Sequence, residues 1–245
     1  MNRYKASAIH LGICLLVGAL VLALMHHLWY PGPYFGALEA GVLLLIVLGV
    51  DVTIGPLITL VIWKTDARRL KFDLTVIGTL QVAALLYGLH VVYEARPVYM
   101  VFAVDSFDVV TASDLSEEEL TKAGNSEYAH LPLTGPRIVA ARNPADPAER
   151  EKILMSSLEG GADLPQMPRY YVPYLEEKAQ VLSRLRSLEM LRKKFPQVDT
   201  YVSADEKADE RWGYLPVRTR RQAFTALVDK RSAEVVRLIP VDPWG

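Results

Sequence analysis

The chain has 245 residues, 51% of them hydrophobic, and its 27 basic and 28 acidic side chains give a formal net charge of −1. A near-neutral chain has no electrostatic footprint for nucleic acid, and a single cysteine excludes an internal disulfide and a thiolate zinc site. Only ten of the charges lie in residues 1–93, whereas residues 94–245 hold the other 45. This asymmetry predicts two domains in two media, one of which is lipid.

Three apolar stretches in residues 1–93 predict membrane-spanning helices. Residues 9–28 carry no full charge and match a hydrocarbon thickness of roughly 30 Å at about 1.5 Å per helical residue. Residues 35–63 and 74–93 are also long enough to cross the membrane. No small-residue cleavage site follows the first stretch, so we expect it to remain as an anchor rather than to be a removed signal peptide.

The positive charges beside these stretches predict their orientation. Arg3 and Lys5 precede the first stretch, and four cations lie in residues 64–71 between the second and the third. The link at residues 30–34 contains none. Because cytoplasmic loops carry an excess of lysine and arginine, we expect the N-terminus in the cytoplasm and residues 94–245 outside it.

Asp51 is an acidic residue near the middle of the second stretch. A carboxylate at that depth costs a few kcal/mol, so it should be protonated, face the helix bundle or pair with a polar group. It could form a hydrogen bond to Gln81 that sets the helix register, receive a polar group from another transmembrane helix, or belong to a proton or ion pathway. Pro56 lacks an amide hydrogen, so with Gly55 it should kink the helix and shape a lateral groove.

Residues 94–245 predict an α+β domain that is large enough to bury its own core. Runs of β-branched and aromatic residues between turns predict strands at 98–104, 107–111, 137–142, 214–219, 224–228 and 235–239, the last two as a hairpin. Two helices should begin near Asp114 and Pro147, and a long third helix should run from Pro173 to Phe195. Leucines recur every three or four residues along this third helix, so it packs on the sheet or receives a partner helix.

The segment before this helix, residues 160–174, contains two glycines, three prolines and three tyrosines. A stiffened loop rich in aromatic residues is suited to contact with a peptide or a protein. Tyr170, Tyr171 and Tyr174 are therefore candidate partner-binding residues. The alternative interpretation is that these tyrosines cover the edge of the core.

Catalytic chemistry has little support in the sequence. Residues 94–245 contain one histidine, His130, and no phosphate loop, nucleophile elbow, HExxH or dinucleotide-binding motif. Asp105, Asp108 and the acidic residues 117–119 are typical of turns and of the first turn of a helix. We therefore expect no enzymatic activity, no catalytic residue, no cofactor and no metal site.

Short segments in a characteristic order extend along almost the whole chain: residues 29–33, 49–51, 55–59, 71–74, 95–99, 102–105, 108–110, 112–114, 170–174, 214–217 and 243–244. With these segments the chain resembles the type IV pilin accessory proteins of the TfpX/TfpZ family. It departs from that family in the basic residues 218–221 and in the turn at residues 229–234, where a glycine is expected.

This resemblance implies a non-enzymatic, chaperone-like accessory factor of the bacterial inner membrane, with a periplasmic C-terminal domain. Its partner would be a major type IV pilin, which it would bind or stabilise to support pilus assembly. The groove near Asp51 and Pro56 would then hold the pilin helix, and the tyrosine-rich loop would touch the pilin head. A membrane-anchored sensor with a periplasmic input domain is the alternative, although the two cytoplasmic segments are too short for an output domain.

Overall fold

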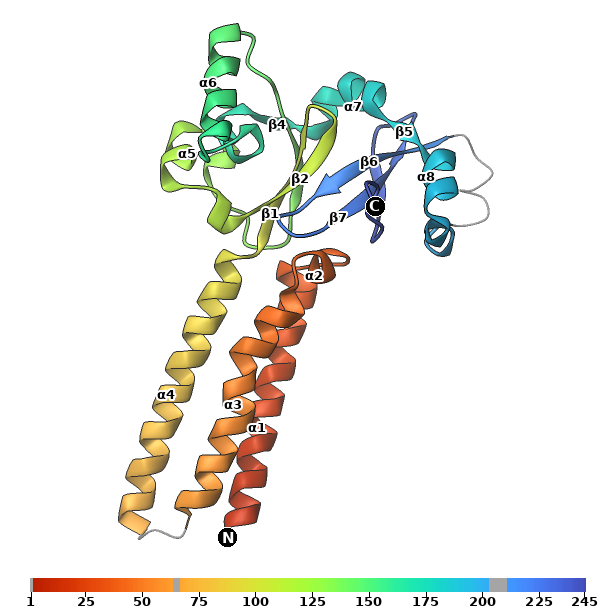
Figure 1. Ribbon diagram of the computed structural model, residues 1–245. Helices are drawn as coiled ribbons and strands as arrows, with labels where there is room; N and C mark the ends of the chain where they lie inside the picture. The colour runs from red at the N-terminus through yellow and green to blue at the C-terminus, as the bar shows by residue number, and fades with distance from the viewer. Residues whose placement is uncertain (1, 64–66, 203–210) are drawn as a thin grey trace. The chain divides into compact units, whose positions relative to one another are not determined.

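The computed structural model describes residues 2–63, 67–202 and 211–245 (Figure 1). Part of the predicted basic loop, Lys64 to Asp66, lies outside the described residues. The chain divides into two compact units, residues 1–95 and 96–245. The first unit is helical and the second contains a mixed sheet with helices, so the predicted fold class, a helical anchor with an α+β domain, is confirmed.

The described residues of the first unit form long apolar helices and two short helical segments. They are α1 (Arg3–Leu24), which continues into the short π-helix η1 (Met25–Trp29), α2 (Tyr34–Ala37), α3 (Ala40–Ile62) and α4 (Ala67–Glu94). In the part of the chain that the structure describes, three segments are long and apolar enough to cross a membrane: Arg3–Trp29, Ala40–Ile62 and Leu70–Glu94. The second begins later than predicted, because α2 ends at Ala37 and Glu39 turns the chain with a φ of 52°.

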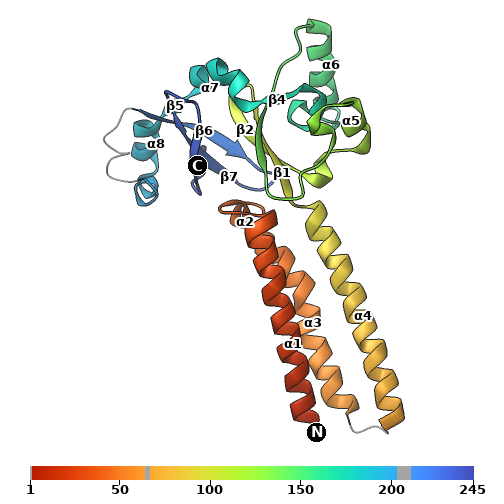
Figure 2. The ribbon, with the colours of Figure 1, turned by 180° about the vertical axis from the view of Figure 1, so that it is seen from behind.

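Figures 1 and 2 show α3 between α1 and α4. Glycine permits this close packing on both sides of α3, because it has no Cβ to keep the helices apart. A Cβ at Gly18 of α1 would lie 3.0 Å from Leu48, and one at Gly88 of α4 would lie 2.6 Å from Val47. The hydroxyl of the buried Tyr30 donates a hydrogen bond of 2.8 Å to the carbonyl oxygen of Val92.

The second unit is built on an eight-stranded mixed sheet with the order β4-β3-β1-β2-β6-β7-β8, in which β5 also pairs with β6. The pairs β1–β3 and β2–β6 are parallel and the others are antiparallel. The strands are β1 (Pro97–Ala103), β2 (Ser106–Thr111), β3 (Arg137–Ala141), β4 (Tyr171–Pro173), β5 (Arg186–Ser187), β6 (Trp212–Arg218), β7 (Ala223–Asp229) and β8 (Val235–Ile239). All six predicted strands are confirmed, whereas β4 and β5 were not predicted.

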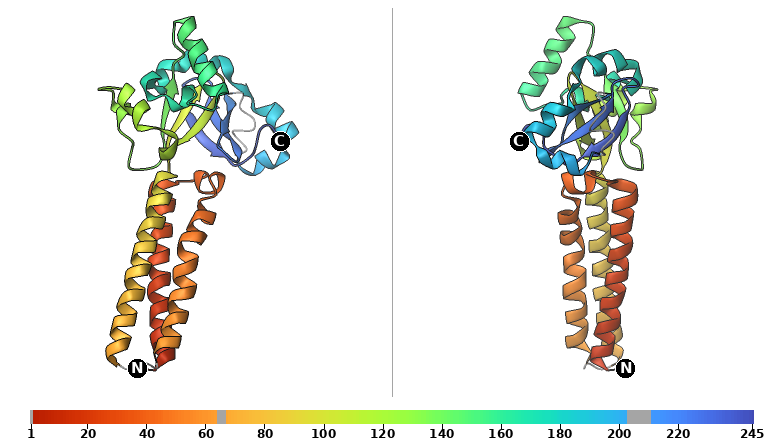
Figure 3. Two further views of the ribbon diagram at one scale, coloured as in Figure 1. Left: turned by 60° about the vertical axis from the view of Figure 1, so that its left-hand side comes forward. Right: turned by 90° about the vertical axis from the view of Figure 1, so that its right-hand side faces the viewer.

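Short helices cover the sheet. They are α5 (Glu117–Lys122), α6 (Pro147–Leu158), α7 (Lys178–Arg184) and α8 (Leu188–Lys194), with 3-10 turns η2 (Ala112–Asp114), η3 (Glu127–Ala129), η4 (Leu164–Gln166), η5 (Pro168–Tyr170), η6 (Tyr174–Glu177) and η7 (Pro196–Thr200). One core cluster joins β1, β2 and β3 to Ile153 of α6 and Leu164 of η4. Another joins Leu188 and Leu191 of α8 to β6 and β7, and Figure 3 shows α8 beside these blue strands.

The predicted long helix from Pro173 to Phe195 is wrong, because the chain forms η6, α7, β5 and α8 over this range. Leu185 adopts an extended conformation with a ψ of 135°, which ends α7. Arg186 and Ser187 then pair with β6. The leucine spacing correctly indicates helical structure in α7 and α8. The pairing of Arg186 and Ser187 with β6 interrupts the helical conformation between these two helices.

Candidate functional site

A cavity of about 200 Å³ lies between α1, α3 and α4 in the membrane unit. Each of these helices contributes polar side chains to its lining: His10 and Cys14 from α1, Asp51 from α3, and Gln81 from α4. The remainder of the lining is apolar and includes Leu48, Val82 and Leu85. The cavity is therefore an apolar space with a few convergent polar groups, which is typical of ligand and partner sites.

Asp51 is 8% exposed, and its Oδ1 atom has no hydrogen-bond partner among the residues that the structure describes. The amide nitrogen of Gln81 lies 3.4 Å from the backbone carbonyl oxygen of Asp51. The same amide occupies the space beside Gly55, where a Cβ would collide with it. The structure thus brings Asp51, Gly55 and Gln81 together, and it leaves one carboxylate oxygen available.

A series of hydrogen bonds holds α1 against α3 next to this cavity. Ser7 Oγ donates to the carbonyl oxygen of Pro56 at 2.9 Å, and α3 remains helical on both sides of this proline. Thr59 Oγ1 donates to the carbonyl oxygen of Gly55 at 3.0 Å and lies 2.7 Å from His10 Nδ1. With the hydroxyl hydrogen of Thr59 assigned to Gly55, Nδ1 of His10 is assigned as the donor, and Nε2 of the neutral ring is then an acceptor.

Sequence reasoning identified Asp51 and Gln81 but missed the contribution of α1. Ser7, His10 and Cys14 are separated by three and four residues, so they lie on one face of the helix. This spacing of polar residues within an apolar helix was the signal that would have found them. Their role follows from the packing of α1 on α3, which the contacts of Ser7 and His10 establish.

In the outer domain, two of the three predicted tyrosines lie in the core. Tyr171 is 6% exposed and donates its hydroxyl hydrogen to the carbonyl oxygen of Pro165. Tyr174 is 8% exposed and donates to the carbonyl oxygen of Ala233 at 2.7 Å. Burial raises the pKa of both phenols above the ordinary value. Their side chains shape the domain from within, and neither is presented to a partner in this conformation.

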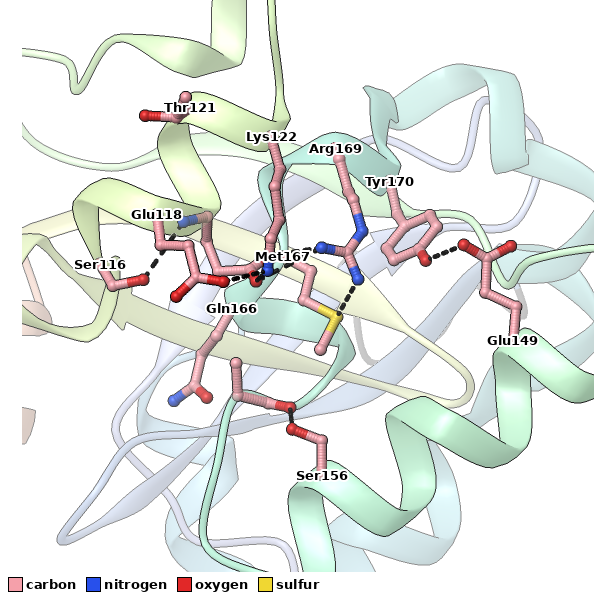
Figure 4. Close-up of polar contacts among 12 residues, drawn as sticks. Ser116, Glu118, Thr121, Lys122, Glu149, Ser156, Gln166, Met167, Arg169 and Tyr170 are labelled. Carbon is pink, nitrogen blue, oxygen red and sulfur yellow. Dashed lines mark hydrogen bonds and ion pairs between the residues drawn. The ribbon is translucent and has the colours of Figure 1, made fainter.

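Tyr170 is the only one of the three tyrosines that is partly exposed. Its hydroxyl donates to Glu149 Oε1 at 2.5 Å, and the guanidinium carbon of Arg169 lies 4.8 Å from the centre of its ring (Figure 4). Arg169 and Glu149 also line a polar cleft of about 700 Å³, which is bordered by α5 and α6. Tyr170 therefore lies beside this cleft, whose volume is larger than that of the cavity in the membrane unit.

Several charged groups of the cleft form ion pairs with one another. The buried carboxylate of Glu119 lies 3.0 Å from Arg169 Nη1 and 2.7 Å from Lys122 Nζ, as Figure 4 shows for the two cations. Lys122 also pairs with Glu118 at 2.7 Å. Among the described residues, no group of three or more histidine, cysteine, aspartate or glutamate side chains could hold a metal ion. The cleft therefore presents polar and charged side chains to the surroundings of the domain.

Comparison with known proteins links the chain to one functional group. A family model described as fimbrial assembly protein FimB matches residues 1–38. The chain is 28% identical over 248 residues to the fimbrial assembly protein of serogroup I from Dichelobacter nodosus, covering 98% of this chain and 95% of that protein. The protein of serogroups C1 and C2 from the same organism is 36% identical over 122 residues, which cover 49% of this chain and 92% of the relative. No solved structure matches.

Proposed function

Because this chain belongs to the family of fimbrial assembly proteins, we propose that it acts in pilus assembly as a non-enzymatic, chaperone-like accessory factor that binds or stabilises a type IV pilin. The observation that carries this proposal is the match to a fimbrial assembly protein over 98% of the chain, which includes both units. The three long apolar helices support a membrane location, in which a pilin with an apolar helix would also be found.

We place the protein in the bacterial inner membrane, with the N-terminus in the cytoplasm and the second unit in the periplasm. Arg3 and Lys5 at the start of α1 and the cations of residues 64–71 support this orientation. Alkaline phosphatase, which is active only in the periplasm, should therefore be active when fused after Gly245. Activity of the enzyme when fused after Asp66 instead would overturn the orientation.

Two contacts with the pilin follow from the candidate sites. Asp51, Gly55 and Gln81 at the membrane cavity, with Pro56 beside them, would receive the pilin helix. Tyr170 and the adjoining polar cleft would contact the pilin head, with Tyr171 and Tyr174 supporting this surface from the core. Two weak contacts on one membrane-bound partner act together through a high effective concentration.

Site-specific photocrosslinking tests these contacts in cells that express both the full chain and the pilin. A crosslinking residue at Val82, which lines the cavity, or at Tyr170 should capture the pilin. Tyr87 of α4 is 71% exposed and lies outside the cavity lining, so the same substitution there is the matched control.

The proposal fails if neither Val82 nor Tyr170 captures pilin while the variants reach normal levels in the membrane. The amount of pilin transcript should also stay unchanged when the protein is deleted, although piliation falls. A fall in the transcript would instead support a sensor.

A further inference from the structure

The membrane cavity contains more hydrogen-bond acceptors than donors. Asp51 Oδ1 is buried, and no described residue donates to it. His10, which also lines the cavity, is assigned Nδ1 as the donor to Thr59, so Nε2 of its neutral ring is a further acceptor. The amide of Gln81 is a side-chain donor beside Asp51: its nitrogen lies 3.4 Å from the backbone carbonyl oxygen of Asp51, and the amide also interacts with the Asp51 carboxyl group, whose Oδ1 still has no partner among the described residues. A ligand that fits this set of groups must bring donors.

No lysine or arginine on the cavity lining faces the carboxyl group of Asp51, whose polar neighbours there are Gln81 and His10. Asp51 is the acidic residue of the lining, and none of the lining residues, all of which the structure describes, is lysine or arginine. An unpaired carboxylate in hydrocarbon is costly, and the low dielectric constant strengthens any pairing with a cation. The cavity is therefore complementary to a positive charge.

The depth of Asp51 limits where such a charge can come from. Asp51 is eleven residues from each end of α3, which places it about 16 Å along the helix axis from either terminus. Amine headgroups of lipids lie at the membrane surface, outside a hydrocarbon core that is roughly 30 Å thick. A cation at this depth has to be carried by another transmembrane segment.

We propose that the cavity binds a protonated amine on a transmembrane helix of the partner, with the Asp51 carboxylate as its counter-ion and His10 Nε2 as a second acceptor. An ammonium group has three donors and no acceptor, which matches the surplus on the lining. The volume of about 200 Å³ is several times the roughly 30 Å³ share of one water, so an amine and its neighbouring methylenes fit. This inference rests on the proposed binding of a membrane-inserted partner.

Cys14 provides a direct probe, because it lies on the same lining and is the single cysteine of the chain. The full chain is placed in nanodiscs of phosphatidylcholine and phosphatidylglycerol. Cys14 is then modified with a cationic reagent, aminoethyl methanethiosulfonate, or with a neutral one, methyl methanethiosulfonate. The ratio of the two rates cancels changes in the reactivity of the thiol itself. Relative to free cysteine, we expect this ratio to be about tenfold higher in the parent protein, which corresponds to about 1.4 kcal/mol.

Variants at Asp51 assign this preference to the carboxylate. Asp51→Asn should reduce the rate ratio to that of free cysteine, while Asp51→Glu should retain most of it. Asp73→Asn removes the same charge from α4 outside the cavity lining and should leave the ratio unchanged. An unchanged ratio in Asp51→Asn would overturn the inference, as would a Cys14 that reacts with neither reagent.

A pair of model helices tests the ligand class. One leucine-rich transmembrane peptide carries a central lysine and the other a methionine, and their binding to the full chain is measured in the same nanodiscs by energy transfer. We expect the lysine peptide to bind about tenfold more tightly to the parent, and both peptides to bind Asp51→Asn equally. The measurement is repeated in nanodiscs to which phosphatidylethanolamine has been added. If the advantage of the lysine peptide then disappears, the lipid amine is the natural occupant and the assignment to a helix is wrong.

The two proposals fail in different ways. If Val82 captures pilin in both the parent and Asp51→Asn, and the lysine peptide has no advantage, the amine inference is wrong and the proposed function stands. If the lysine peptide has the expected advantage and pilin is never captured, the cavity binds an amine and the proposed function is wrong.

Discussion

Several buried polar side chains of the outer domain have partners, whereas one carboxylate oxygen in the membrane unit has none among the described residues. In the outer domain, Tyr174 donates to a backbone carbonyl and Glu119 lies between two cations. Asp229 is 3% exposed and accepts from Arg211 Nε at 2.8 Å. In the membrane unit, Oδ1 of Asp51 is buried without a partner among the described residues.

This difference separates polar groups that stabilise the fold from one that is available for binding. A satisfied buried group contributes to stability, whereas an unsatisfied one costs free energy and is retained for another reason. The membrane unit has room beside its unsatisfied group, since Asp51 lines a cavity. Substitutions in the outer domain should therefore change stability, and substitutions at Asp51 should change binding.

The largest expected effect is at Tyr174, whose ring centre lies 6.5 Å from that of Phe102 and 5.6 Å from that of Phe107. Tyr174→Ala removes a buried ring and leaves the carbonyl of Ala233 unpaired, so we expect a loss of about 3–5 kcal/mol in the free energy of unfolding of the outer domain. Pulse proteolysis of the full chain in urea measures this. Leu175 is 52% exposed, so Leu175→Ala should cost less than about 0.5 kcal/mol, and an equal loss at both positions would contradict the prediction.

A smaller loss in the free energy of unfolding is expected when Glu119, the buried acid of the polar cleft, is removed. Glu119→Ala leaves Arg169 and Lys122 without their shared carboxylate, and this should cost about 1.5–3 kcal/mol. The exposed Glu117 is in the same helical turn, so Glu117→Ala is the control and should cost less than about 1 kcal/mol. The same proteolysis assay compares them. If Glu119→Ala unfolds like the parent, the cleft is not a stabilising network.

Acid should weaken the outer domain through Asp229. Hydrogen bonds from Arg211 lower the pKa of this carboxyl to about 2, whereas in the unfolded chain it is about 3.9. The unfolded state therefore takes up the proton first as the pH falls. The contribution is complete above about pH 5 and is lost progressively as the pH falls towards 2. Asp229→Asn should reduce the dependence of stability on pH in this range, and a slope identical to that of the parent would show that another group is responsible.

The smallest change in stability is expected at Asp51. Asp51→Leu replaces an unpaired carboxylate by an apolar side chain next to a cavity, so the thermal stability of the detergent-solubilised protein should be unchanged or should rise. Thermal unfolding monitored by circular dichroism measures this, with Asp51→Asn as the isosteric comparison. A large loss of stability in both variants would show that Asp51 is a structural residue, like the buried acids of the outer domain.

Much of the membrane unit could be predicted, because hydropathy accumulates along a continuous segment. Its polar contacts could not be predicted in the same way. Asp51 and Gln81 suggested a pair within the bundle and the structure places them together, but the packing of Gln81 on Gly55 and its approach to the backbone of Asp51 could not be predicted. His10 enters the cavity through the rotation of α1, which the composition of that helix does not specify.

The tyrosine-rich segment shows a similar limit in the outer domain. Its composition correctly indicated an unusual segment, yet Tyr171 is the first residue of a strand that pairs with Ala141 of β3. A three-residue strand is too short to show an alternation of polar and apolar residues in the sequence. Its formation depends on the sheet edge at β3, which another part of the chain provides. Tyr170, one residue earlier, lies outside that strand and remains partly exposed.

The sequence by itself determined that this protein has two domains in different media, how many helices can cross a membrane, and which fimbrial family it belongs to. These properties follow from residues that are neighbours along the chain, so they can be predicted without knowledge of any tertiary contact. Only the tertiary structure decided which polar groups find partners, as when Tyr174 meets Ala233, 59 residues away. Such pairs depend on helix rotation and strand register, and so does the unpaired state of Asp51 that makes its cavity a binding site.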